Sequence, residues 1–163
     1  MFRNLPPITK NLLLINIICF LADMVFSRYG VNLSHILGLH YVTASEFGFW
    51  QPITYMFMHA NFSHLFFNMF AVLMFAPAIE DRWGSRRFLI YYLVTGIGAG
   101  IIQEIVWALQ LQPVLNSVDP LMAAQLANRV VTIGASGAVF GILLAFGWLF
   151  PDVRMYILFI PVP

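Results

Sequence analysis

The residues best suited to chemistry in this sequence are a serine among glycines and a pair of polar side chains on a separate apolar segment. Ser136 lies in a run of small residues from Gly134 to Gly137, at the start of an apolar stretch. His64 and Asn68 are four residues apart, so on a helix they share one face. Glycines beside the serine would let a substrate backbone approach its hydroxyl closely. The combination favours peptide hydrolysis by a serine nucleophile.

Such hydrolysis needs a base that takes the hydroxyl proton and hydrogen-bond donors aimed at the developing oxyanion. Ser136 near a helix N-terminus would sit beside free backbone N–H groups. His64 and Asn68 are candidates for side-chain donors to the same oxygen, and Gly134 and Gly137 for the close approach around the nucleophile. No histidine follows His64 in the sequence, so a base is not evident.

Each of these residues also has a structural interpretation. Serine, glycine and alanine are common where membrane helices pack closely. Packing alone would explain Ser136, and a position at the membrane interface would explain His64. Asn68 is harder to dismiss, because polar groups deep in a membrane segment tend to be functional or to face the bundle. The occurrence of all three at one depth favours catalysis. Pairs of small residues four apart predict close packing at Gly134/Ala138, Gly137/Gly141 and Gly96/Gly100.

The composition identifies an integral membrane protein. The chain has 163 residues, of which 61% are hydrophobic and only 9% charged, whereas soluble domains have about 25% charged residues. A net charge of +1 gives no argument for a nucleic-acid partner. We see no spacing typical of zinc or haem ligands, so we expect no metal and no cofactor.

Four apolar segments are long enough to cross a bilayer, which takes roughly 20 residues of helix. We therefore predict an all-α membrane protein with one transmembrane domain over residues 1–163. The segment between the first two spans is too broken to cross and too apolar for a free linker, and we interpret it as an interfacial loop. The predicted spans are about 8–29, 62–79, 88–109 and 131–150, with the interfacial loop at about 30–61 and a turn at 80–87.

The distribution of basic residues predicts a cytoplasmic N-terminus, because cytoplasmic loops are enriched in Lys and Arg. With this orientation Arg3, Lys10, Arg82, Arg86, Arg87 and Arg154 face the cytoplasm and only Arg28 and Arg129 face outward. His64, Asn68 and Ser136 then lie within roughly 10 Å of the outer surface, with Ser136 one to two turns into its span. The compact loops fit a bacterial inner membrane.

The remaining polar residues have structural interpretations. We expect Glu80 to form hydrogen bonds that support folding, before the Trp83-Gly84 turn. Asp23 and Glu104 lie toward the outer ends of their spans, where snorkelling to the interface would satisfy them. His35 and His40 are expected in loops.

Four stretches together resemble the rhomboid intramembrane serine proteases: Trp50–His59, His64–Met69, Glu80–Gly84 and Gly134–Gly137. Their order and spacing match that family from about residue 8 to 160. The resemblance implies a six-helix bundle in which Ser136 is the nucleophile and His64 and Asn68 help to hold the oxyanion. It also implies transmembrane protein substrates with a single span, cut near the outer surface of the lipid bilayer, and no metal or cofactor.

The sequence departs from the family pattern at several places. Gln51 stands where an arginine is common, and Ala76 and Pro77 stand where glycine is common. The family's base is a histidine on a sixth span, in an Ala-His-x-x-Gly setting. The sequence ends at Pro163 with no equivalent, so we expect four of the six helices, an inactive chain as given, and a fragment of a longer reading frame. The alternative function is a non-catalytic membrane protein that binds client transmembrane helices.

Overall fold

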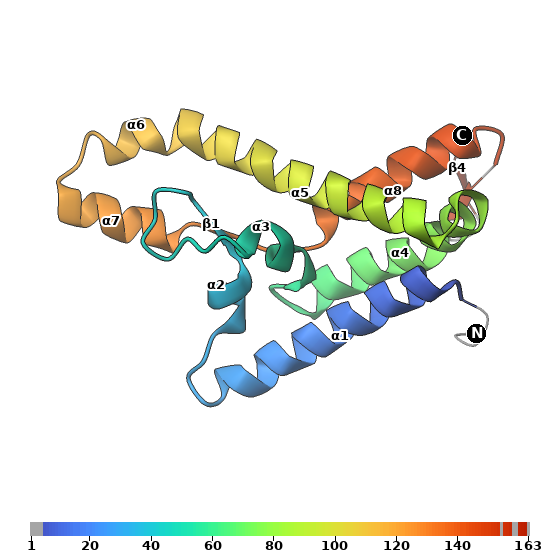
Figure 1. Ribbon diagram of the computed structural model, residues 1–163, viewed down its shortest axis with the longest axis horizontal. Helices are drawn as coiled ribbons and strands as arrows, with labels where there is room; N and C mark the ends of the chain where they lie inside the picture. Colours follow the sequence, from blue (N-terminus) through green and yellow to red (C-terminus); the bar gives the residue numbers. More distant parts are fainter. Residues whose placement is uncertain (1–4, 154, 158–159, 163) are drawn as a thin grey trace.

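The structure is a computed structural model that describes residues 5–153, 155–157 and 160–162. Most of its residues are helical, which confirms the predicted all-α membrane bundle (Figure 1). Arg3 and Arg154, which entered the charge count above, lie outside the described residues. In chain order the elements are α1 (Pro7–Ser27), α2 (Leu33–Leu37), β1 (Leu39–His40), α3 (Gln51–Thr54), the 3₁₀ helix η2 (Tyr55–Phe57), α4 (Phe62–Trp83), α5 (Ser85–Gln110), α6 (Gln112–Leu115), α7 (Pro120–Arg129), β2 (Val131–Thr132), α8 (Ser136–Leu149), β3 (Met155–Ile157) and β4 (Ile160–Val162).

Within the described residues, three helices, α1, α4 and α5, are long and apolar enough to cross a membrane. They overlap the first three predicted spans, and each differs from its prediction by only a few residues at either end. Helix α4 packs against α1 and α8, and α5 packs most extensively against α8. At the far end from the two termini, α5 continues into α6, and the chain reverses into α7 (Figure 1).

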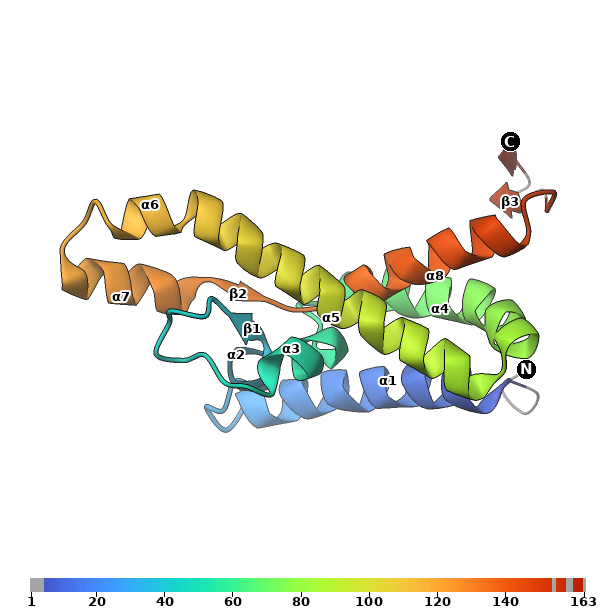
Figure 2. The same ribbon diagram turned by 45° about the horizontal axis from the view of Figure 1, so that its top comes forward.

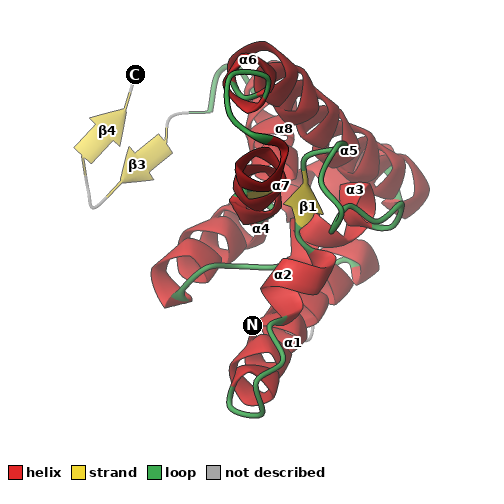
Figure 3. Cartoon of the chain, turned by 90° about the vertical axis from the view of Figure 1, so that its left-hand side faces the viewer, coloured by secondary structure: helices red, strands yellow, loops and turns green. Residues whose placement is uncertain are grey.

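The fourth predicted span, 131–150, is wrong at its beginning. Helix α8 starts at Ser136 and has 14 residues, which extend about 21 Å, less than the roughly 30 Å hydrocarbon core. The five preceding residues are not helical because β2 pairs antiparallel with β1, with Leu39 opposite Thr132. This pairing carries the chain in an extended conformation to the start of α8 (Figure 2). Figure 3 shows β3 and β4, which pair with each other, apart from the helices.

The predicted turn at 80–87 is also wrong in extent. Helix α4 continues to Trp83 and α5 begins at Ser85, so Gly84 is the whole connection. Gly84 has φ +81°, a left-handed conformation that glycine adopts without strain. The charged residues before Gly84 belong to the last turn of α4, because charged side chains are compatible with a helical backbone.

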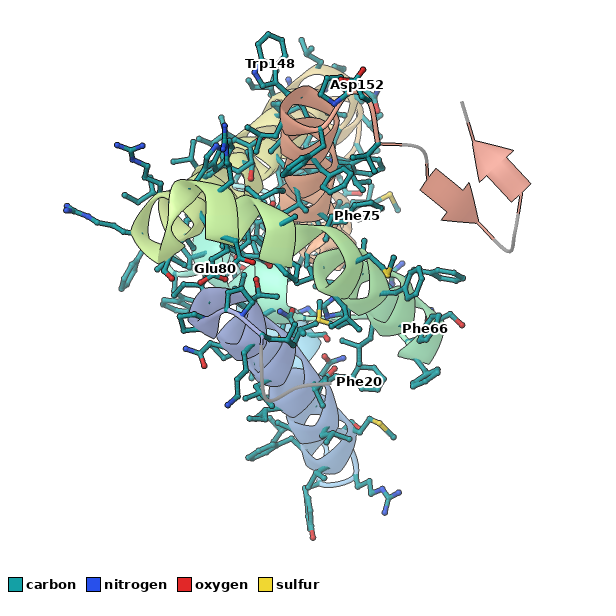
Figure 4. The ribbon with its side chains drawn as sticks, turned by 90° about the vertical axis from the view of Figure 1, so that its right-hand side faces the viewer. Phe20, Phe66, Phe75, Glu80, Trp148 and Asp152 are labelled. Atoms are coloured by element: carbon teal, nitrogen blue, oxygen red, sulfur yellow. The ribbon has the colours of Figure 1, made fainter. Side chains whose placement is uncertain are left out.

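Glu80 ties the start of α1 to the end of α4, as expected from the sequence. Its carboxylate accepts hydrogen bonds from the backbone N–H groups of Ile8 (2.9 Å) and Thr9 (2.7 Å). It also accepts from the hydroxyls of Thr9 (2.8 Å) and Ser85 (2.7 Å). Figure 4 shows Glu80 where the two helices meet. The side chain therefore caps the first turn of α1, whose N–H groups lack helical partners.

The segment 30–61 is more regular than an interfacial loop, since it contains α2, β1, α3 and η2. Gln51 anchors it: its amide donates to the carbonyls of Ile36 and Glu46, and its oxygen accepts from the N–H of His40. Gln51, which stands where an arginine is common in the family, therefore holds the segment 30–61 together. His35 lies in α2 and His40 is fully buried in β1, so the prediction of loop histidines is wrong.

Asp23 and Glu104 hold this segment against the long helices rather than snorkelling. The Asp23 carboxylate accepts hydrogen bonds from the backbone N–H and hydroxyl of Ser34. The Glu104 carboxylate accepts one from the N–H of Val42. Ser34 lies in the first turn of α2, where backbone N–H groups lack helical partners, and Val42 lies in the loop after β1. The two carboxylates supply the acceptors for these backbone donors.

Candidate active site

Ser136 is the first residue of α8, not one to two turns inside it. The first helical hydrogen bond of α8 is donated by the Val139 N–H to the Ala135 carbonyl, at 2.9 Å. The N–H groups of the three residues before Val139, beginning with Ser136, therefore precede the helical ladder. The Ser136 residue is exposed. A reacting carbonyl beside its hydroxyl would meet the positive end of the helix dipole.

The loop before Ser136 turns at Gly134, which has φ +125°. Its N–H donates a 2.8 Å hydrogen bond to the Tyr55 carbonyl in η2. A Cβ atom added at Gly134 would lie 2.6 Å from Cε1 and 2.7 Å from Nε2 of the His64 ring. Real Cβ atoms do not approach other atoms so closely, so both the backbone angle and the space at this position require glycine.

His64 and Asn68 lie in the first two turns of α4. The helix begins at Asn61, whose side chain caps it by accepting a 2.8 Å hydrogen bond from the His64 N–H. The Asn68 amide donates to the His64 carbonyl at 3.0 Å, and the side chain is 6% exposed. One amide N–H is thus occupied and its second remains available. The structure brings His64 against Gly134, whereas it records no hydrogen bond from Asn68 to α8 among the described residues.

Gly137 faces away from this histidine. A Cβ atom added there would overlap the Cβ of Ala99 in α5, and Gly141 one turn later faces Thr95. Gly96 and Gly100 similarly face Met56 and Tyr55. The predicted packing of small residues is therefore found at both of these pairs. Gly134 shapes the loop in front of the serine, while Gly137 sets the distance between α5 and α8.

His59 lies beside the site, and no definite role was predicted for it from sequence. Its ring packs edge-on against the His64 ring, with centroids 5.0 Å apart, and the residue is 2% exposed. Burial, assisted by repulsion from His64, lowers the pKa of His59 from 6.5 to about 4. Neither ring nitrogen has a hydrogen-bond partner among the described residues. His59 is therefore a neutral, buried imidazole at physiological pH.

Tyr55 is a second residue that the sequence reasoning missed. Its hydroxyl donates a 2.6 Å hydrogen bond to the Gly96 carbonyl in α5, and its own carbonyl receives the Gly134 N–H. The side chain is 3% exposed, and burial raises the pKa of its hydroxyl, which stays protonated. Tyr55 thus fixes the loop before Ser136 relative to α5. The signal in the sequence that could have identified Tyr55 is its position in the Trp50–His59 stretch, one of the four that resemble the family.

The site has no arrangement that suggests a metal. Within residues 5–153 and the two described strands beyond them, no group of three or more His, Cys, Asp or Glu side chains could hold an ion. Over the same residues, no side chain hydrogen-bonds to the Ser136 hydroxyl. What the geometry offers is an exposed serine at a helix start, with an imidazole and an amide on the adjacent helix α4.

Comparison with known proteins places the chain in a family. A family model described as the rhomboid domain matches residues 46–163, which include every site residue described above. The protein belongs to the rhomboid family, whose members are generally serine proteases of the membrane.

Three relatives illustrate the similarity. Putative rhomboid protease YdcA of Bacillus subtilis is 38% identical over 93 residues, covering 57% of this chain and 37% of the relative. Rhomboid protease AarA of Providencia stuartii is 31% identical over 143 residues, covering 85% and 49%. Rhomboid-like protein 11, chloroplastic, of Arabidopsis thaliana is 30% identical over 132 residues, covering 80% and 38%. The chain thus spans less than half the length of these relatives.

Proposed function

We propose that this chain carries the nucleophile and oxyanion-binding part of an intramembrane serine endopeptidase. The observation that carries the proposal is the contact between the His64 ring and Gly134, two residues before Ser136. It joins the polar face of α4 to the start of α8. The substrates are single-span membrane proteins, cut near the outer bilayer surface, and the N-terminus of the enzyme is cytoplasmic.

In this proposal the Ser136 hydroxyl attacks the scissile carbonyl, and the negative charge develops on the carbonyl oxygen. Donors for that oxygen are the free N–H groups at the start of α8, the His64 ring and the second amide N–H of Asn68. Donors of this kind act most strongly where water is excluded, and removing one typically costs about 10²–10³ in kcat. Gly134 leaves the space that the substrate backbone needs, and Gly137 keeps α8 close to α5.

No residue of this chain is assigned as the base. His59 is neutral and could accept a proton, but its ring is buried against His64 and no hydrogen bond links it to Ser136 among the described residues. Without a base the serine hydroxyl is a weak nucleophile. The proposal therefore places the base outside this chain.

The experiment compares Ser136→Ala with the unchanged serine in a version extended to the length of its relatives, using a single-span substrate in proteoliposomes. We expect cleavage with Ser136 and none with the alanine variant. Ser117→Ala, a change in the loop before α7, is the matched control and should cleave normally. Cleavage that persists in Ser136→Ala would show that another residue is the nucleophile.

A second measurement addresses the chain as given, treated with a fluorophosphonate probe. We expect no labelling of Ser136, because no base activates it. Labelling would reveal a base within residues 1–163, and His59→Phe would then test the first candidate. If the extended version binds a substrate segment but never cuts it, the client-binding alternative replaces the proposal.

A further inference from the structure

An apolar groove separates α1 from the first three turns of α4, on the side of α4 away from α8. Its walls run from Leu13 to Met24 on α1 and from Phe62 to Leu73 on α4, and it encloses 460 Å³ without any polar lining. Phe20 and Phe66 stand on the two facing helices in Figure 4. Within the described residues the groove is open toward the outside of the bundle, between two helices that are long and apolar enough to cross a membrane.

A second pocket of 430 Å³ continues the groove at the end where α1 stops and α4 starts. The two share Phe20, Met24 and Phe62 in their linings, so they form one continuous depression. The added pocket contributes polar groups from Asp23, Ser27 and His59. No lysine or arginine lines either part. The depression is therefore amphipathic, with an acidic and neutral polar end and an apolar remainder.

His59 indicates that the polar end takes a ligand. A buried imidazole without good hydrogen bonds is costly, because its nitrogens lose water without gaining a partner. Among the described residues no well-aligned hydrogen bond reaches either His59 nitrogen, and only the backbone of Phe57 offers a weak partner, although the ring lines this pocket. A neutral imidazole offers one donor and one acceptor. A ligand with a hydrogen-bonding headgroup would satisfy it.

Asp23 defines the charge of that headgroup. Its two carboxylate oxygens receive hydrogen bonds from Ser34 at 3.1 and 2.7 Å. Each oxygen has a second lone pair that these bonds leave free. With a carboxylate present and no basic side chain in the lining, the pocket favours a group that carries positive charge and N–H donors.

The apolar part has the length of one acyl chain. The twelve helical residues from Phe62 to Leu73 extend about 18 Å, close to the roughly 15 Å that one leaflet contributes to the hydrocarbon core. The length and the wholly apolar lining of the groove therefore match one lipid chain.

We propose that the depression between α1 and α4 is a binding site for one phosphatidylethanolamine molecule of the bilayer. One acyl chain lies in the groove, the ammonium group pairs with Asp23, and the headgroup hydrogen-bonds to His59. A choline headgroup lacks N–H donors, and a glycerol headgroup leaves the lipid with a net negative charge facing Asp23. The site therefore distinguishes ethanolamine from both.

The test is native mass spectrometry of the whole chain, delipidated in detergent and titrated with phosphatidylethanolamine, phosphatidylcholine or phosphatidylglycerol of identical acyl chains. We expect a single tightly bound phosphatidylethanolamine, with about tenfold weaker binding of the other two. Equal binding of the three lipids by the unchanged chain would overturn the headgroup assignment, whatever the variants do.

Two tryptophan variants locate the acyl chain. Ile17→Trp fills the groove and should weaken phosphatidylethanolamine binding about tenfold. Ile18→Trp is the matched control, since Ile18 is 61% exposed on the same helix and does not line the groove, and it should bind normally. Asp23→Asn should remove the preference for ethanolamine while leaving binding of the acyl chain. Equal losses in both tryptophan variants would place the lipid elsewhere.

A photoreactive amino acid at position 17 provides an independent readout in membranes. We expect a crosslinked phospholipid adduct. A crosslink to a co-expressed single-span protein in its place would mean that the groove receives a protein segment, and the lipid proposal would fail.

Discussion

The two faces of α4 are built in opposite ways. On its inner side the helix is closely fitted, with Val72 and Ala76 fully buried and the His64 ring against Gly134, two residues before α8. Toward α1 its first three turns leave an open apolar groove beside the bulky Phe66 and Phe70. One helix thus has a tightly packed face that carries candidate site residues and a loosely packed apolar face that lines the groove.

The difference shows which contacts in this bundle tolerate change. A close-packed contact has no free volume, so an added methyl group must displace backbone. An open apolar groove accepts added volume, because the atoms displaced are lipid. We therefore expect substitutions on the two faces to have effects of very different size, and the following variants measure that difference.

Glu80→Ala should give the largest effect, because it removes the acceptor for the donors that join α1 to α4. Buried donors left without partners cost about 1–3 kcal/mol each, so we expect a loss of about 3–5 kcal/mol in the free energy of unfolding. Unfolding in mixed micelles measures it. Asp81→Ala, the exposed neighbour, should change stability by less than about 0.5 kcal/mol. Similar values for the two variants would contradict the capping role of Glu80.

Gly134→Ala should have the next largest effect, a loss of about 2–4 kcal/mol in the free energy of unfolding. The added methyl group would overpack against His64, and alanine would be strained at the positive φ. The matched control is Gly147→Ala inside α8, where an added Cβ meets nothing within 4 Å. Removing glycine from a helix there should stabilise by up to about 1 kcal/mol. A loss of stability in Gly134→Ala together with a gain in Gly147→Ala would support the contrast in packing. Small changes in both variants would show that the loop before Ser136 can move aside.

Acidification should destabilise the protein through His59. In the unfolded chain this histidine takes up a proton near pH 6.5, and in the folded protein only near pH 4. Between these values the unfolded state binds more protons, so stability falls as the pH is lowered from 6.5 to 4 and does not depend on this group above 6.5. We expect the free energy of unfolding to fall by about 2–3 kcal/mol over this pH range. His59→Phe should flatten this part of the stability curve; an unchanged slope would assign the effect to other groups.

Tyr55→Phe should have the smallest effect, near 1 kcal/mol, since it removes one hydrogen bond to a carbonyl while the ring remains. The hydrogen bond from Gly134 to the Tyr55 carbonyl is unaffected by this change. Thermal unfolding of the two proteins side by side measures the loss. A cost above about 3 kcal/mol would mean that the hydroxyl also supports the loop before the serine.

The apolar segments and the polar residues that interrupt them were predictable from sequence because both depend on local composition. The three long helices, the structural hydrogen bonding of Glu80 and the close packing at Gly137/Gly141 followed from such patterns, whereas the capping of α1 by Glu80 did not. The start of α8 did not, since Val131 and Thr132 read as membrane helix and become a strand only through pairing with Leu39 and His40. Tertiary pairing overrides local preference in such short elements.

Within the candidate site, residue types were predictable and their contacts were not. Spacing put His64 and Asn68 on one face, but the approach of His64 to Gly134 depends on how α4 meets α8. The roles of Tyr55 and His59 arise from long-range contacts, the backbone of Tyr55 with Gly134 and the ring of His59 with His64. The catalytic roles proposed for Ser136, His64 and Asn68 stay predictions.

The pairing of β1 with β2 also has a consequence for the order of events during synthesis. The paired strands are separated by about 90 residues of chain, which a ribosome translating 5–20 residues per second adds in roughly 5–18 s. During that interval the first strand has no partner, and the loop before Ser136 cannot take its final shape. The surroundings of Ser136 therefore form only after the first helices of the chain have been made.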